Sequence, residues 1–191
     1  SQLNRFSDAV TSFRHSLRIE PESAEAMNNL GNAFKRQGQL TDAVTWLTKA
    51  SEIEPRNLQI QNNLGNALRD TGRLEEAVTC YKEAIAIDPN HADSHCLYAF
   101  SLLALGAFTR GWEEYEWRWT SDEHEAARIF PFPPWDGSDL DGKTILIWGE
   151  QGIGDEIMFA SMLPELISAA SHVILECEHR LVPLFRRSFQ T

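Results

Sequence analysis

The residues with the clearest chemical potential near the C-terminal end of this chain surround one glycine-rich turn. Asp155 follows Gly149, Gly152 and Gly154, directly after an apolar run. A carboxylate at the mouth of a helix can take a proton from a hydroxyl group, and glycines let the backbone pass close to a ligand. Aspartate is also a preferred helix N-cap, which would accept a hydrogen bond from a backbone N–H two or three residues on. The residues alone leave both roles open.

A second set consists of asparagines at matched positions. They are Asn28, Asn29, Asn32, Asn62, Asn63 and Asn66. Asparagine is a poor residue for a helix interior, so its repetition needs a reason. Because an amide has both a donor and an acceptor, a row of outward amides can hold the N–H and C=O groups of an extended peptide. For Asn29 and Asn63, peptide contact and helix packing are equal alternatives; for Asn32 and Asn66 we expect packing.

Several classes of site are excluded by composition and spacing. The glycine-rich turn lacks a following Gly-Lys-Ser/Thr, and Ile157 stands where a dinucleotide fingerprint needs its third glycine. The formal net charge of −11 and the absence of a basic stripe predict no nucleic-acid partner. No apolar run is long enough to span a membrane. Cys80, Cys96 and Cys177 match no metal or disulfide spacing, so we expect reduced thiols, no metal site and a cytoplasmic protein.

The helices that must position the asparagines repeat along the chain. The segment AMNNLGNAFKRQGQLTDAV realigns on IQNNLGNALRDTGRLEEAV, one period of 34 residues later. The recurring marks are Pro21, Pro55 and Pro89, Gly31 and Gly65, Gly38 and Gly72, and Ala9, Ala43 and Ala77. On these marks the chain closely resembles the tetratricopeptide (TPR) repeat family. The resemblance implies a mainly α fold, an α-solenoid of antiparallel helix pairs.

Each recurring residue has a physical reason. Gly31 and Gly65 fall inside helices, where glycine costs ~1 kcal/mol against alanine, so we expect a second helix to pack closely there. The small side chains of Ala43 and Ala77 suit that contact. The later glycines of each repeat end the first helix in a left-handed conformation, and the prolines end the second helix.

The period also divides the chain. We expect a TPR solenoid over residues 1–119, made of a partial repeat 1–23, full repeats 24–57 and 58–91, and a divergent repeat 92–119. In the last repeat Cys96, Leu97 and Phe100 replace the asparagines, and we expect a following domain to cover that apolar surface. A stripe of Trp112, Tyr115 and Trp119 then predicts a cap or a packing surface; an aromatic ligand cage is the alternative.

The asparagine rows suggest a function for the solenoid. The run NNLGNALRDTGRLEEAVTCYKEAIAIDPN is similar to the repeats of TPR proteins fused to O-linked N-acetylglucosamine transferases, which carry an asparagine ladder. This resemblance implies a scaffold for protein–protein interaction, in which the concave groove holds extended polypeptide with loose sequence preference. Asn28 and Asn62 stand where chaperone-binding repeats place a lysine that clamps a C-terminal carboxylate.

The sequence changes character after Trp119. Residues 120–142 read as a proline- and aromatic-rich linker, whose Phe130, Phe132 and Trp135 we expect to pack on their own protein; a ligand for a proline-binding domain is the alternative. Residues 143–191 read as the start of an α/β domain. We expect a strand over 144–148 that is buried on both faces, a helix over about 156–170, a strand over 172–177 and a helix over 181–189. One βαβ unit is little for a separate domain, so we expect a longer protein.

This segment carries a second resemblance. The run WDGSDLDGKTILIWGEQGIGDEIMFASMLPEL resembles the glycosyltransferase-like domain of bacterial TPR proteins, which is similar to heptosyltransferases of the two-lobed GT-B fold; Gly154, Asp155, Leu163 and Pro164 match its motif. The resemblance implies that a longer protein could transfer sugar from a nucleotide donor, with Asp155 as the base and the repeats selecting the acceptor. For this chain we expect no bound cofactor and no activity of its own, which leaves a scaffold and an enzyme as alternatives.

Overall fold

The structure, a computed structural model, describes residues 2–120, 130–149 and 152–189 of the chain. The chain divides into two compact units, Ser1–Arg128 and Ile129–Thr191. The first is helical and the second contains a small parallel sheet, which confirms the predicted α-solenoid followed by a partial α/β segment. The finer repeat boundaries stay a prediction, and most of the first half of the expected linker lies outside the described residues.

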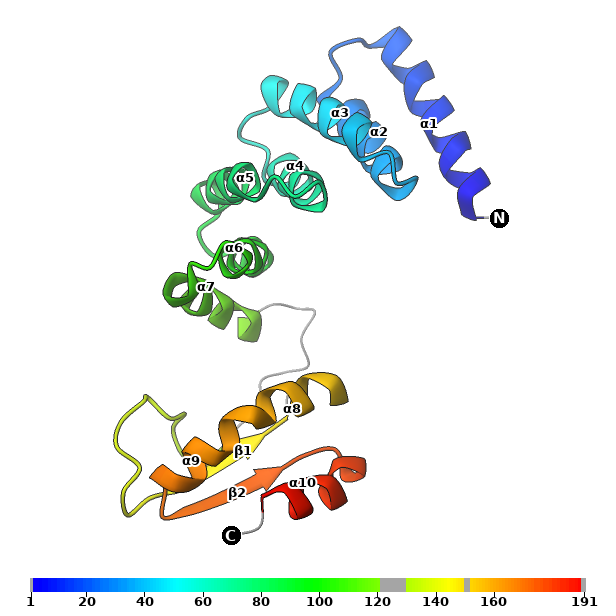
Figure 1. The fold of residues 1–191 in the computed structure, drawn as a ribbon. Coiled ribbons are helices and arrows are strands. Elements are labelled where there is room, and N and C mark those ends of the chain that lie inside the picture. Colours follow the sequence, from blue (N-terminus) through cyan, green and yellow to red (C-terminus); the bar gives the residue numbers. More distant parts are fainter. Residues whose placement is uncertain (1, 121–129, 150–151, 190–191) are drawn as a thin grey trace. The chain divides into compact units, whose positions relative to one another are not determined.

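The helical unit is a row of antiparallel helix pairs that follows a curve (Figure 1). Its elements are α1 (Gln2–Ile19), α2 (Ala24–Arg36), α3 (Leu40–Ile53), α4 (Leu58–Asp70), α5 (Leu74–Ile87), α6 (Ala92–Ala104), α7 (Phe108–Tyr115) and the 3-10 helix η1 (Glu116–Thr120). The first helices of the pairs, α2, α4 and α6, lie on the inner side of the curve, and α3, α5 and α7 lie on the outer side. Within this unit the inner side is therefore a surface made by first helices alone.

The ends of the first helices repeat as faithfully as the sequence does. Each begins at a side-chain cap in the same register: Ser23 accepts from the N–H of Ala26, Asn57 from Ile60, and the ring of His91 from Ser94. Each ends at a glycine with positive φ, namely Gly38 and Gly72 at 78° and Gly106 at 79°. The predicted left-handed turns are confirmed, and a third exists where the sequence analysis had marked none.

The close contact inside each helix pair differs in part from the expected one. A Cβ added to Gly31 would lie 2.6 Å from Cγ of Leu47, and one added to Gly65 would lie 2.6 Å from Cε1 of Tyr81. The glycines therefore accommodate a large side chain of the partner helix. Ala43 lies at this contact as expected, since its carbonyl oxygen would be 3.2 Å from a Cβ on Gly31. Leu47 and Tyr81 are fully buried because the glycines leave room for them.

The α/β unit contains two parallel strands and short helices. Its elements are β1 (Thr144–Trp148), α8 (Ile153–Phe159), the 3-10 helix η2 (Ala160–Met162), α9 (Leu163–Ala169), β2 (His172–Glu176), the 3-10 helix η3 (His179–Leu181) and α10 (Val182–Ser188). β1 pairs with β2 in a register that sets Thr144 opposite His172 and Trp148 opposite Glu176. The expected single helix over 156–170 is interrupted, because Pro164 lacks an N–H donor and begins a new helix.

Neither strand is fully buried, so the expected burial of β1 on both faces is wrong. One face packs against helices, where Ile147 and Leu175 contact the cluster of Leu163 and Phe185. On the other side Ile174 is 48% exposed. The ring of Phe130 lies 5.6 Å from that of Trp148 and 5.4 Å from that of Phe132. The nearby linker residue Trp135 donates a hydrogen bond to the carbonyl of Ser138. The aromatic residues of the linker from residue 130 onward thus make contacts within their own unit.

Replacing Gly65 by alanine tests the close approach. The new methyl group would overlap the Tyr81 ring, and forcing extra volume into a packed site costs about 1–3 kcal/mol, which exceeds the ~1 kcal/mol gained in helix propensity. We expect a lower free energy of unfolding in urea, followed by circular dichroism. Gly154→Ala is the control, since no atom lies within 4 Å of its added methyl group. Equal or greater stability of Gly65→Ala would contradict the packing.

Candidate peptide-binding surface

The inner face of the helical unit is defined by matching positions on each first helix, starting from the residue opposite the close-packed glycine. At about 100° per residue, Asn29 lies about 160° round α2 from Gly31, which faces α3. Asn32 and Arg36 follow Asn29 by about one and two helical turns, so they lie on the same side of α2. The residues 34 and 68 positions later occupy the matching places on α4 and α6. The inner face consists of Asn29, Asn32, Arg36, Asn63, Asn66, Asp70, Leu97, Phe100 and Ala104.

Two of the six asparagines do not reach this face. Asn28 is 5% exposed and Asn62 is 9% exposed, so the outward position expected of both is wrong. Nδ2 of Asn62 donates to Oγ of Ser94 over 2.8 Å, and that hydroxyl also lies 3.1 Å from Oδ1 of Asn62. The buried amide of Asn62 thus joins α4 to α6, and left unpaired it would be costly in a packed interior.

The next pair of asparagines is split between packing and exposure. Nδ2 of Asn63 donates to Oδ1 of Asn28 over 2.9 Å, which joins α4 to α2. Asn29 occupies the same position one repeat earlier, yet its amide makes no side-chain hydrogen bond with the residues that the structure describes. The equivalence expected from the sequence therefore does not hold, and Asn29 is the member of this pair whose donor and acceptor are available.

The third pair is divided in the same way. Oδ1 of Asn66 accepts from the hydroxyl of Tyr81 over 2.9 Å, which fits the packing role expected of it. Asn32 occupies the same position one repeat earlier, where Leu47 stands in place of Tyr81 and offers no hydroxyl group. The described part of the chain gives the Asn32 amide no partner. Asn29 and Asn32 are half-buried and lie one turn apart on α2. Together they form the patch of unbonded amides on the inner face.

A nearby constellation resembles nucleophile chemistry but cannot perform it. Nδ1 of His91 lies 2.9 Å from Oγ of Ser94, which in turn contacts Asn62. Ser94 is 0% exposed, so no substrate can reach its hydroxyl group. The ring nitrogen of His91 also accepts from the N–H of Ser94, which is the cap of α6. The arrangement begins a helix and ties two repeats together.

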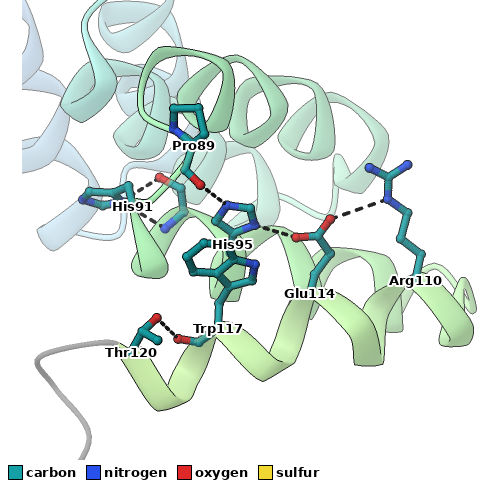
Figure 2. A network of polar contacts seen from close by, with 8 residues as sticks. Pro89, His91, His95, Arg110, Glu114, Trp117 and Thr120 are labelled. Atoms are coloured by element: carbon teal, nitrogen blue, oxygen red, sulfur yellow. Dashed lines mark hydrogen bonds and ion pairs between the residues drawn. The ribbon is translucent and has the colours of Figure 1, made fainter.

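A polar network holds the divergent repeat together, and of its residues the sequence analysis had marked only Pro89 (Figure 2). Nδ1 of His95 lies 2.6 Å from Oε2 of Glu114, and Nε2 lies 3.0 Å from the carbonyl of Pro89. The imidazole stacks on Trp117 with ring centroids 4.1 Å apart, and Arg110 lies 3.7 Å from the other carboxylate oxygen. Because the carbonyl can only accept, Nε2 carries a proton. The network thus joins α6 to α7 and η1.

The expected aromatic stripe is partly filled by the chain's own arginine. The guanidinium carbon of Arg118 lies 4.5 Å from the ring centroid of Tyr115 and 4.2 Å from that of Trp119. Arg118 is buried, and it donates to the carbonyl of Tyr115. The space that a cationic ligand would take in an aromatic cage is therefore occupied, which favours the packing role over the cage.

The glycine-rich turn is organised by a carboxylate that sequence reasoning missed. Glu156 accepts from the N–H of Glu178 through Oε2 over 2.9 Å, and a Cβ on Gly149 would lie 2.6 Å from its Cδ. Glu156 thereby ties the residue after β1 to the segment after β2. In the sequence, this role of Glu156 is indicated only by the glycine at position 149, where a side chain would overlap the carboxylate.

Asp155 is not the N-cap that the sequence allowed. The helix begins two residues earlier, Gly152 is at the cap position, and no side chain caps α8. Asp155 is half-buried in the first turn, and Gly154 has no atom within 4 Å of an added Cβ. Since two carboxylates crowd this turn, it is unfavourable to a phosphate group. Glu150 and Gln151 lie outside the described residues.

No group of His, Cys, Asp and Glu side chains suited to a metal ion occurs among the residues that the structure places. None of the described helices is long and apolar enough to cross a bilayer. Cys80, Cys96 and Cys177 are free thiols, and burial raises the pKa of Cys80 to about 11.

The matched asparagines predict unequal effects on stability. Asn63→Ala leaves the buried side-chain oxygen Oδ1 of Asn28 without its donor, which costs about 1–3 kcal/mol. This loss outweighs the few tenths of a kcal/mol gained in helix propensity. Asn29→Ala removes no hydrogen bond seen in the structure, so we expect unchanged or slightly higher stability. Urea unfolding of the two variants, followed by circular dichroism, makes the comparison. Equal losses would mean that Asn29 is also structural.

Comparison with known proteins supports the helical repeats. Residues 31–69 and 65–106 match a family described as TPR repeat, and residues 12–45 match one described as Tetratricopeptide repeat. Protein FlbA of Caulobacter vibrioides is 47% identical over 92 residues, which is 46% of this chain and 15% of FlbA. The match thus spans a small part of that relative.

Solved structures of MamA share the fold. One crystal structure has 22% identity and a TM-score of 0.57 and covers 60% of this chain and 67% of that chain. MamA from Desulfovibrio magneticus RS-1 has 21% identity and a TM-score of 0.57, covering 64% and 71%. A MamA structure from AMB-1 has 26% identity and a TM-score of 0.54, covering 62% and 64%. Residues 12–106 of this chain thus match models of tetratricopeptide repeats, in agreement with the fold.

Proposed function

We propose that the helical unit is a docking scaffold that holds an extended polypeptide against its inner face. The observation that carries this is the pair of unbonded amides of Asn29 and Asn32 on the inner side of the curve. TPR proteins act as scaffolds for protein interaction, and the repeats support that role here. Each amide offers one acceptor and two donor hydrogens, which suit the C=O and N–H groups of a peptide backbone.

The peptide that fits this surface is extended and is recognised mainly through its backbone. Neighbouring first helices are fixed to one another by Asn63 and Asn28 and by Asn62 and Ser94, so the face is formed before a peptide arrives. A preformed surface reduces the entropy lost on binding. A cytoplasmic location is part of the same proposal.

The double variant Asn29→Ala, Asn32→Ala tests this function. Peptides selected on the chain from a random displayed library are titrated by fluorescence polarisation. Two lost hydrogen bonds of about 0.5–1.5 kcal/mol each predict binding weaker by about fivefold to 150-fold, with melting unchanged. Asn90→Ala, in an exposed turn, is the control. Undiminished binding to the double variant would remove these amides from the site.

A second function belongs to the α/β unit in a longer protein. There the unit would be part of a glycosyltransferase-like lobe, and the repeats would select the acceptor. In support, Asp155 caps no helix, so its carboxylate is available to take a proton from an acceptor hydroxyl. Its place after β1 is at the carboxyl end of a parallel strand, where ligands of open α/β sheets gather. A nucleotide sugar would be the donor.

For this chain we expect no binding of nucleotide sugars. The glycine-rich turn is crowded by the carboxylates of Asp155 and Glu156, which repel a diphosphate. Calorimetric titration with UDP-, GDP- and ADP-sugars should give no heat of binding at millimolar ligand. Micromolar binding of any of them would mean that the turn is a nucleotide site by itself.

A further inference from the structure

The inner face changes its chemistry from one helix to the next. Its first row runs Asn29, Asn63 and Leu97, and its second row runs Asn32, Asn66 and Phe100. On α6 both amides are thus replaced by apolar side chains. Phe100 is 47% exposed, although its ring lies 5.4 Å from that of Tyr115. At the α6 end, the inner face therefore offers an exposed aromatic ring at the position that Asn32 and Asn66 occupy on α2 and α4.

The opposite end of the same face carries an excess of positive charge. Arg36 and Asp70 of the inner face lie near the C-terminal ends of α2 and α4, with Lys35 and Arg69 beside them. Nζ of Lys35 lies 4.0 Å from Oδ2 of Asp70, and Arg69 lies 3.6 Å from Oδ1. Arg36 stacks over the ring of Phe6 at 5.8 Å and has no ion pair with a described residue. Asp70 thus pairs with two cations and Arg36 adds a third positive charge, in a chain whose net charge is −11.

We propose that the inner face selects an extended peptide with an acidic side chain near Arg36 and a large apolar side chain on Phe100. The proposal rests on the proposed scaffold function and gives the partner a composition and a spacing. The acidic group complements the local positive charge, and the apolar group covers a ring that continues the amide rows. Specificity then comes from the two ends of the peptide, while the amides hold the backbone between them.

The spacing of the two side chains follows from the helices. Neighbouring packed helices lie about 10 Å apart, so two steps from α2 to α6 cover about 20 Å. An extended chain rises about 3.3 Å per residue, which places the two side chains roughly six residues apart. A shorter separation would leave one of the two contacts unmade.

Synthetic peptides of glycine, serine and asparagine test the proposal in fluorescence polarisation with the whole chain at low ionic strength. One peptide carries Asp and Leu about six residues apart. The others replace Asp by Asn, replace Leu by Ser, replace both, or halve the spacing. We expect the first peptide to bind at least about tenfold more tightly than the doubly substituted one, with both single changes weakening it. The short-spaced peptide should lose most of this advantage.

Two variants link the preferences to the residues. Phe100→Asn restores the amide found at Asn32 and Asn66. It should abolish the preference for Leu over Ser without changing the affinity for the doubly substituted peptide, called the plain peptide below. Arg36→Gln should abolish the preference for Asp over Asn. The controls are Phe108→Asn and Arg56→Gln, which change an exposed aromatic residue and an exposed cation outside the inner face. Circular dichroism checks that each variant is folded.

The outcomes separate this inference from the function on which it rests. If no peptide binds, including those selected from a random library, the scaffold function itself fails. If the plain peptide binds as well as the Asp–Leu peptide, the face reads backbone only and the present proposal is overturned. The proposal is also overturned if Phe100→Asn and its control Phe108→Asn change the Leu preference equally.

Discussion

The helical unit depends on the close approach of the two helices within each repeat. Gly31 and Gly65 bring α2 and α4 so near to their partners that Leu47 and Tyr81 fill the space a Cβ would need. This contact fixes the rotation of the first helix about its own axis. Since side chains follow at about 100° steps, fixing Gly31 against α3 also decides that Asn29 points to the opposite side. The inner face is therefore a consequence of a packing constraint on the other side of the same helix.

A second layer of interactions fixes one repeat against the next. The amides of Asn28 and Asn63 join α2 to α4, and Asn62 with Ser94 joins α4 to α6. Buried hydrogen bonds of this kind add little net stability, but a mismatched register would leave each group unpaired at a cost of about 1–3 kcal/mol. The buried asparagines thus favour one alignment of neighbouring repeats. That alignment keeps the amides of Asn29 and Asn32 in a defined place for a peptide.

The 34-residue period was enough to predict the helix pairs and the left-handed turns at Gly38 and Gly72, because these depend on local backbone chemistry. It could not separate Asn28 from Asn29, since adjacent residues differ by only one 100° step and the rotation is set by tertiary packing. In the α/β unit the alternation of apolar segments predicted both strands. The role of Glu156 depends on a contact with Glu178, 22 residues away, which no local pattern encodes.

The fourth repeat keeps the architecture while replacing the residues that build it elsewhere. Ala99 stands at the position of the close-packing glycine, and Gly111 on α7 takes over, since a Cβ there would lie 2.7 Å from Cδ2 of Leu103. Space is thus made on the second helix instead of the first. The His95–Glu114 pair and the stacked Trp117 then hold α6 to α7 and η1 by polar and aromatic contacts. Because these contacts hold the fourth repeat together, its inner positions do not need the hydrogen bonds that Asn63 and Asn66 make. Leu97 and Phe100 can therefore face a partner.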